Sequence, residues 1–234
     1  MMGYDPIYMI ITAVAMGLSA LCGSMLKKRF KEYSQMPMSS GLSGKEVAEK
    51  MLYDSGITDV QVISVPGQLT DHYNPQNKTV NLSDWVYGER TVAAAAVSAH
   101  ECGHAIQHAQ SYAWLTMRSR MVPMVGFSSK MSQFVIMAGF VLMAVAGQLG
   151  VWVLGVGIVL FAMTTLFSLV TLPVEFDASK RALAWLQTAN ITSGEEQKQA
   201  SSALKWAAST YVVAALASLG NLFYFIMIFL NRRD

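Results

Sequence analysis

Charged residues are scarce in this chain. They make up 14% of its 234 residues, whereas 53% are hydrophobic, a balance that is unusual for a soluble globular protein. The formal net charge of +2 is too small to indicate a nucleic-acid partner, and the basic residues lie beside apolar segments rather than in an aromatic-rich patch. The composition therefore argues against nucleic-acid binding and indicates the lipid bilayer as a partner.

Cysteine is also rare, and the first apolar run has no basic residue before it. The two cysteines, Cys22 and Cys102, are too few for a disulfide framework, so we expect two free thiols. A signal peptide begins with positive charge and has a shorter apolar core than this run. We therefore expect the first run to be retained as a membrane anchor.

Long apolar runs predict about four transmembrane helices. A helix needs about 20 apolar residues to cross a bilayer. The runs at 7–26 and 209–231 each provide one crossing, and the run at 131–172 provides two, with a tight turn at 147–150.

The polar segments at 27–130 and 173–208 are predicted to form one lobe in the cytoplasm. Most of the 17 Lys and Arg residues fall in these segments, and positively charged loops tend to stay on the cytoplasmic side. Arg232 and Arg233 do not fit this charge pattern, because four crossings would place these two basic residues on the outer side of the membrane.

The lobe is predicted to contain both helices and strands. Hydrophobic periodicity predicts helices over 45–54 and 90–110, and one or two helices around a turn at 191–194. Turn-forming residues separate three short β-rich pieces, which predict a small antiparallel sheet; these pieces are 60–65, 68–72 and 78–82. The expected fold class is an α-helical membrane protein with a small cytoplasmic α+β lobe.

The helix predicted over 90–110 contains His100-Glu101-Cys102-Gly103-His104, an HExxH sequence. The two histidines lie one helical turn apart, so their imidazoles can converge on one Zn²⁺, while Glu101 can act as general base toward the metal-bound water. A surface or capping histidine pair is the alternative, but these side chains are costly to bury without a metal. Gly103 indicates close packing beside the metal, since Gly destabilises a helix by about 1 kcal/mol relative to Ala.

A catalytic zinc has three protein ligands, so one more ligand is expected. Glu175 follows the third predicted span, and two crossings separate it from His100, so both residues are expected on one side of the bilayer. A helix-start acid stabilised by the macrodipole is the alternative. His108 is expected only as a neighbour, because three ligands on one straight helix cannot close around a metal.

Three further residues are weaker candidates. Asp177 is expected to orient a metal-bound histidine, or to be an ordinary acid near a helix start. His72 is expected to line the cleft and hold substrate, although a polar turn would contain the same residues. Arg181 is expected to position a substrate carboxylate or an acid near the metal, with contact to lipid phosphates as the alternative.

These residues together resemble the YugP-type membrane zinc metallopeptidases, bacterial gluzincins distantly related to the HtpX and CAAX-prenyl endopeptidase group. The resemblance implies His100, His104 and Glu175 as zinc ligands, and Glu101 as general base. It also implies a strand within 69–82 beside the substrate. The HtpX-like group has Asp four residues after its ligand Glu, whereas this chain has Ser179. The likeness covers nearly the whole chain and is carried by Tyr4-Asp5-Pro6, Leu69-Thr70-Asp71-His72-Tyr73, Asn81-Leu82-Ser83, the nine residues Ala99 to Gln107, and the eight residues Leu172 to Ser179.

The predicted function is a zinc-dependent endopeptidase of the bacterial inner membrane with one Zn²⁺ per chain. It is expected to hydrolyse membrane-associated or misfolded proteins on the cytoplasmic side. A non-proteolytic membrane scaffold or assembly factor with a structural zinc is the alternative, and a homo-oligomer or a regulatory membrane partner is left open. A small transporter is disfavoured, because the predicted spans contain almost no ionisable residue.

Overall fold

The computed structural model describes residues 5–233, so Tyr4 of the Tyr4-Asp5-Pro6 segment lies outside the described residues. The chain divides into two compact units, which we call the apolar unit and the lobe. The apolar unit comprises the residues up to Leu21, Met117–Leu172 and the residues from Thr210 onward. The lobe comprises Cys22–Thr116 and Pro173–Ser209.

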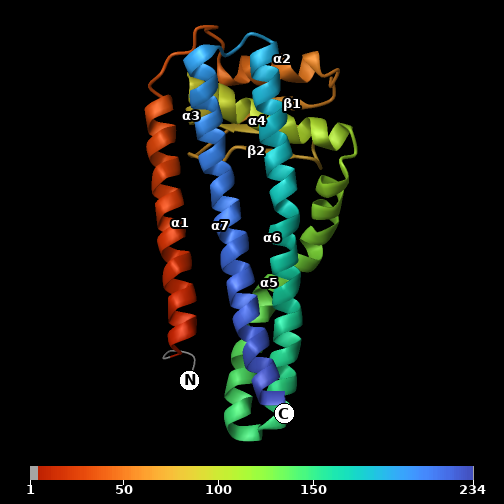
Figure 1. Cartoon of the computed structure of the whole chain (residues 1–234). Coiled ribbons are helices and arrows are strands. Elements are labelled where there is room, and N and C mark those ends of the chain that lie inside the picture. The colour runs from red at the N-terminus through yellow and green to blue at the C-terminus, as the bar shows by residue number, and fades with distance from the viewer. Residues whose placement is uncertain (1–4, 234) are drawn as a thin grey trace. The chain divides into compact units, whose positions relative to one another are not determined.

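Four helices among the described residues are long and apolar enough to cross a membrane, which agrees with the predicted number. A turn at Gly147 joins the second of these helices to the third. Gly147 has a φ of +54°, a left-handed conformation that favours glycine. The Gly150 N–H donates to the Gly147 carbonyl at 3.0 Å, which confirms the predicted tight turn. The four helices are α1 (Pro6–Tyr33), α5 (Ala113–Ala146), α6 (Gln148–Thr188) and α7 (Gly194–Arg233) (Figure 1).

Helix α5 is longer than the span expected from the sequence. It begins at Ala113, and its residues from Met117 onward belong to the apolar unit, whereas the sequence analysis assigned 27–130 to the lobe. Three basic residues make this stretch look polar, but single charges spaced along a helix do not end it. These residues are Arg118, Arg120 and Lys130.

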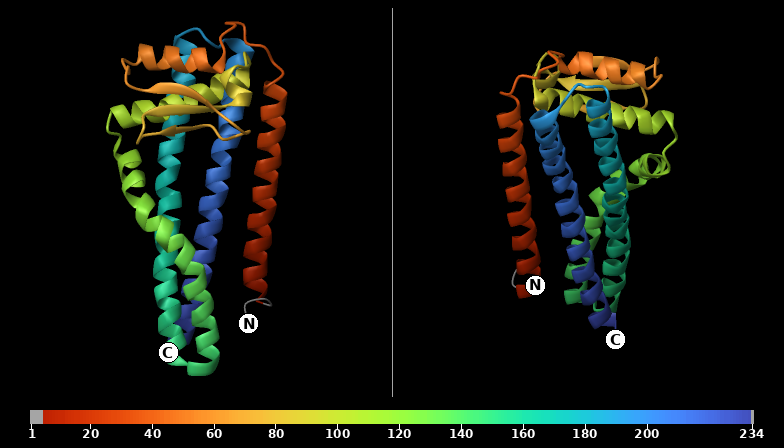
Figure 2. Two further views of the ribbon diagram at one scale, coloured as in Figure 1. Left: turned by 180° about the vertical axis from the view of Figure 1, so that it is seen from behind. Right: turned by 45° about the horizontal axis from the view of Figure 1, so that its top comes forward.

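Small residues bring the helices of the apolar unit close together. A Cβ added to Gly139 of α5 would lie 2.7 Å from the Leu154 backbone of α6, and small residues permit such close packing between membrane helices. The core continues into α7, where Tyr224 and Phe225 are buried with Leu154. Figures 1 and 2 show these three helices side by side.

The lobe is organised around α4 (Val92–Ala109), which packs against α2 (Gly44–Asp54) and against the sheet. A capping box begins α2: the Ser43 side chain accepts from the Glu46 N–H, and the Glu46 carboxylate accepts from the Ser43 N–H at 2.7 Å. The predicted helix over 45–54 is thus observed with its start one residue earlier.

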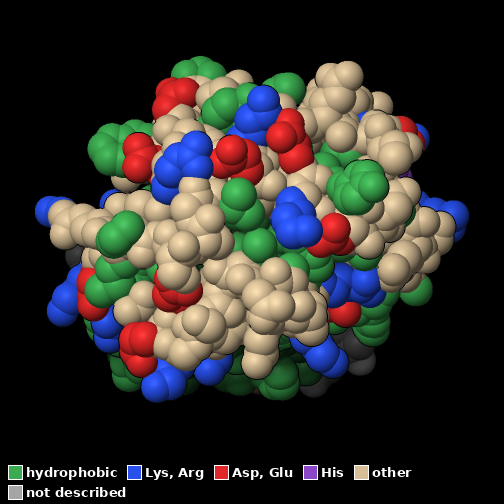
Figure 3. Space-filling view, turned by 90° about the horizontal axis from the view of Figure 1, so that it is seen from above, with side chains coloured by type: hydrophobic (Ala, Val, Ile, Leu, Met, Phe, Trp, Pro, Cys, Tyr) green, Lys and Arg blue, Asp and Glu red, His purple; other side chains and the backbone are tan. Residues whose placement is uncertain are grey.

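Helix α2 is amphipathic. Its buried face includes Val47 and Met51, whereas its exposed face carries the ion pairs Lys45–Glu49 at 3.6 Å and Lys50–Asp54 at 3.1 Å. On the face of the molecule seen in Figure 3, acidic and basic side chains are likewise interspersed.

The sheet differs from the antiparallel sheet that the sequence predicted. It contains β1 (Gln61–Val65), β2 (His72–Asn74) and β3 (Thr79–Ser83) in the order β1-β3-β2. Strand β3 pairs antiparallel with β2 but parallel with β1, so the sheet is mixed.

A loop explains this difference. The piece predicted as a strand over 68–72 is mostly irregular, and Leu69 has a φ of +59°, which ends extended structure there. The loop between β1 and β2 leaves room for β3 between these two strands. Strands β1 and β2 therefore pair with opposite edges of β3. Helix α3 (Asp84–Tyr87) follows directly after β3.

Candidate metal centre

Helix α4 places the HExxH sequence in the interior of the lobe. Thr91 caps the start of the helix, since its hydroxyl accepts from the Ala94 N–H at 3.3 Å. Alanines occupy most of its first turns and are almost completely buried, so neighbouring backbones can approach closely. The predicted long buried helix is observed.

Gly103 allows α4 to touch α6 at the level of the histidines. A Cβ added to Gly103 would lie 2.7 Å from the Ala178 carbonyl oxygen and 3.1 Å from its Cα. Both of these are backbone atoms, so any side chain at position 103 would push the two helices apart. This agrees with the close packing that was expected from a glycine inside a strong helix.

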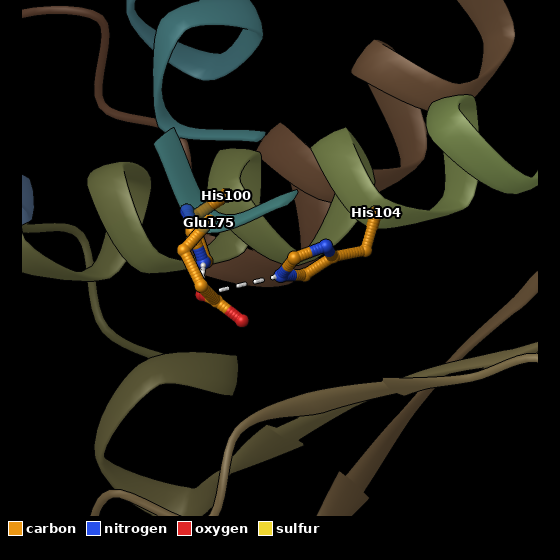
Figure 4. A group of neighbouring side chains, drawn as sticks. All are labelled: His100, His104 and Glu175. Atoms are coloured by element: carbon orange, nitrogen blue, oxygen red, sulfur yellow. Dashed lines mark ion pairs between the residues drawn. The ribbon is translucent and has the colours of Figure 1, made fainter. Parts of the chain in front are cut away.

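Three side chains from these two helices converge (Figure 4). Nε2 of His100 lies 3.3 Å from Oε2 of Glu175, and Nε2 of His104 lies 3.7 Å from the same oxygen. The imidazole rings are nearly perpendicular, with centroids 4.8 Å apart. One nitrogen or oxygen from each residue lies within 4.8 Å of the others, which makes this a group that could hold a metal ion.

The group is buried, and its members affect each other's charge. Glu175 is 3% exposed. Burial raises its pKa, but hydrogen bonds from His100 and His104 outweigh burial and hold the pKa of Glu175 well below its usual value. Burial lowers the pKa of His104, but Glu175 and Glu101 outweigh it, so the pKa of His104 is raised. Without a metal, the site therefore favours an ionised carboxylate beside a protonated imidazole.

Residues 8–230 match the model of a protein family described as "Putative neutral zinc metallopeptidase". The chain belongs to this family. A curated relative in Bacillus subtilis (strain 168), named "Putative membrane protease YugP", is 41% identical over 228 residues, which cover 97% of this chain and 99% of the relative. No solved structure matches the chain.

The donors in this member of the zinc metallopeptidase family suit the metal that the family name implies. Imidazole nitrogens and carboxylate oxygens are common zinc ligands, and catalytic zinc sites use three protein ligands. His100, His104 and Glu175 supply two imidazoles and one carboxylate, all from the lobe. The residues present therefore fit a zinc ion.

Glu101 lies between the two histidines in the sequence and is nearly buried. Its charge is close enough to raise the pKa of His104. Its charge also acts on Asp71, whose pKa is raised mainly by burial and further by Glu101. Asp71 accepts from the N–H of Ser83 at 2.7 Å, which attaches the loop before β2 to the end of β3.

Asp177 and Arg181 lie beside the histidine group without belonging to it. Nε of Arg181 donates to Oδ2 of Asp177 at 2.5 Å. Asp177 is linked to His104 through Gln107, whose Nε2 donates to the same Oδ2 at 2.8 Å and whose Oε1 lies 3.0 Å from Nδ1 of His104. Asp177 and Arg181 were candidates from the sequence, whereas Gln107 was not.

Ser179 is a second residue whose contact the sequence analysis did not foresee. Its Oγ lies 3.1 Å from Nδ1 of His100, and it stands four residues after Glu175, the position noted as a departure from the HtpX-like group. The hydroxyl can accept a hydrogen bond from Nδ1, which leaves Nε2 of His100 facing Glu175.

His108 and His72 are separate from the three-residue group in the described part of the chain. Nδ1 of His108 lies 2.8 Å from the Tyr73 hydroxyl, so His108 joins α4 to β2. Nδ1 of His72 lies 2.8 Å from the Thr70 carbonyl oxygen, which can only accept a hydrogen bond, so the ring stabilises its own loop.

The two cysteines are free thiols, as expected. Cys102 lies within the HExxH sequence, but its Sγ lies 3.5 Å from the Ala48 carbonyl of α2. Burial raises the pKa of the Cys102 thiol well above its usual value, and a protonated thiol is a poor metal ligand.

Proposed function

We propose that this chain is a zinc-dependent endopeptidase of the bacterial inner membrane, with one zinc ion per chain. The observation that carries the proposal is the convergence of two imidazoles and a buried carboxylate, whose donor atoms lie within 4.8 Å of one another. His100, His104 and Glu175 would hold the ion. The family description and the name of the relative support this assignment.

Glu101 would act as the general base. When bound, zinc lowers the pKa of a water molecule and polarises the carbonyl group of a peptide bond. The Glu101 carboxylate would accept a proton from the attacking water and then pass it to the nitrogen of the leaving amine. Its place beside His100, and its electrostatic effect on His104, support this role.

The substrates would be membrane-associated or misfolded proteins near the inner face of the membrane. Four apolar helices and the name of the relative support a membrane location. The excess of Lys and Arg in the lobe segments supports a cytoplasmic lobe of gluzincin type, since positive loops tend to stay inside.

Replacing Glu101 by Gln tests the mechanism. The change removes the proton acceptor but no proposed ligand, so we expect unchanged zinc content with cleavage of a model protein substrate reduced by about 10²-fold or more. Zinc is measured by elemental analysis and cleavage by gel assay. Glu195→Gln is the matched control, because Glu195 is an exposed acid paired with Lys198.

The same experiment addresses the alternative of a non-proteolytic scaffold with a structural zinc. A zinc-loaded wild-type chain that cleaves nothing would favour the scaffold. Cleavage by Glu101→Gln at the wild-type rate would contradict the role of Glu101. A Glu175→Ala chain with unchanged zinc content would remove Glu175 from the site.

A further inference from the structure

Gln107 forms hydrogen bonds from both ends of its side-chain amide. Its Oε1 lies 3.0 Å from Nδ1 of His104. Its Nε2 donates to the Val174 carbonyl oxygen at 2.8 Å and to the Asp177 carboxylate at 2.8 Å. The side chain is fully buried, so a lost partner would not be replaced by solvent.

The partners of this amide determine its orientation. A carbonyl oxygen and a carboxylate can only accept, so the NH₂ group must face Val174 and Asp177. The Oε1 atom is left to accept from Nδ1–H of His104. A neutral imidazole with its proton on Nδ1 presents the lone pair of Nε2, the nitrogen that lies 3.7 Å from Glu175.

Gln107 also connects the two helices that carry the proposed ligands. Its own backbone belongs to α4 with His104, and it bonds the backbone of α6 at Val174, the residue directly before Glu175. Arg181 extends this hydrogen-bond network, because its Nε donates to Asp177 and its Nη1 donates to the Gln110 side chain at 2.6 Å.

We propose that Gln107 is a positioning residue of the metal centre. It fixes the tautomer and ring orientation of His104. It also links His104 to the part of α6 that carries Glu175. This inference rests on the proposed zinc site. Residues that hold a ligating histidine in place typically change metal affinity by about 10–100-fold when they are replaced.

The first test replaces Gln107 by Met, which keeps the approximate volume but removes both ends of the amide. Zinc affinity is measured on the full-length chain in detergent by competition with a chromophoric chelator. We expect a loss of about 10–100-fold. Gln197→Met is the matched control, since the Gln197 amide also donates to a backbone carbonyl of α6, that of Leu183 at 3.0 Å, but belongs to α7 and bonds this carbonyl instead of a histidine. We expect little change in its zinc affinity.

The second test reverses the hydrogen bonds. In Gln107→Glu, the new carboxylate can accept from His104 but loses its donors and faces the Asp177 carboxylate, so zinc affinity should fall. Adding Asp177→Asn supplies an NH₂ donor for the Glu carboxylate and an oxygen that can accept from Arg181. The double variant should recover most of the lost affinity, which a purely space-filling role for Gln107 does not predict.

The outcomes separate this inference from the proposed function. A wild-type chain that binds no zinc would overturn both. A wild-type chain that binds zinc, with equal affinity in Gln107→Met, would overturn only the role of Gln107. If Gln107→Met fails to fold, the comparison of Gln107→Glu with the double variant decides, and a double variant no better than the single one would overturn the inference.

Discussion

The apolar unit of this chain exposes many large apolar side chains, whereas the lobe exposes few. In the apolar unit, large side chains such as Phe134 and Val145 are 72% and 78% exposed. In the lobe, Val47, Met51 and Leu186 are completely buried. The difference indicates that the first unit is built for lipid and the second for water, and the candidate metal centre lies wholly in the second.

The largest effect is expected from introducing a charge on the outer surface of each unit. In Phe134→Asp, a carboxylate would face lipid near the middle of a span, at a cost of about 3 kcal/mol for insertion, so the amount of membrane-inserted protein should fall sharply. The Tyr53 side chain on α2 is 79% exposed, so in Tyr53→Asp the amount of membrane-inserted protein should be unchanged. Membrane fractionation after expression measures the inserted amount of each variant. Similar losses in the two variants would contradict the proposed difference between the apolar unit and the lobe.

A smaller effect is expected from adding one methyl group to a helix of each unit. In Gly103→Ala, the new Cβ would meet the Ala178 backbone at 2.7 Å, so we expect a loss of about 1–3 kcal/mol in unfolding free energy together with weaker zinc binding. In Gly126→Ala of α5, nothing lies within 4 Å of the new Cβ, so stability should be unchanged or slightly raised. Thermal unfolding and zinc titration of both variants provide the measurement. Unaltered zinc binding by Gly103→Ala would show that the contact does not shape the site.

The smallest effect concerns pH and should arise in the lobe. In the metal-free chain the pKa of Glu175 is lowered and that of His104 is raised. The Glu175 contribution to stability is present above its unfolded pKa of about 4.3 and lost as the pH falls through the folded pKa. The His104 contribution is present below its unfolded pKa of about 6.5 and lost as the pH rises through the folded pKa.

The metal-free chain should therefore be more stable near pH 5.5 than near pH 8. The midpoint of thermal unfolding after chelator treatment measures this difference. Glu175→Ala should reduce it, because the partner of His104 is gone. A wild-type midpoint that rises from pH 5.5 to pH 8 would contradict the sign of this prediction.

Features set by neighbouring residues were predictable from the sequence. The helix that became α4 follows from its alanines and from a histidine repeat of one helical turn, and the turn at Gly147 follows from glycine between two apolar runs. The structure also brings Glu175 within 3.3 Å of His100, although the two residues were linked beforehand only by counting membrane crossings and by the family resemblance.

Features that depend on contacts between distant segments were not predictable. The contact of Gln107 with Val174 and that of Ser179 with His100 form where α4 and α6 approach closely at Gly103. The parallel pairing of β1 with β3 likewise depends on the path of the loop between them, and strand periodicity does not encode that path. The start of α5 was missed because its basic residues resemble those of the lobe.

The alanine-rich sequence of α4 has one more consequence, which concerns conformational entropy. Alanine has no side-chain rotamers, so burying it restricts no side-chain rotation, whereas burying a long side chain costs up to about 2 kcal/mol at 25 °C. The run Ala93 to Ala96 is buried to within 1% of complete without that loss. The helix bearing the histidines is thus ordered at a low cost in side-chain entropy, and little of the free energy of cation binding would be needed to offset that cost.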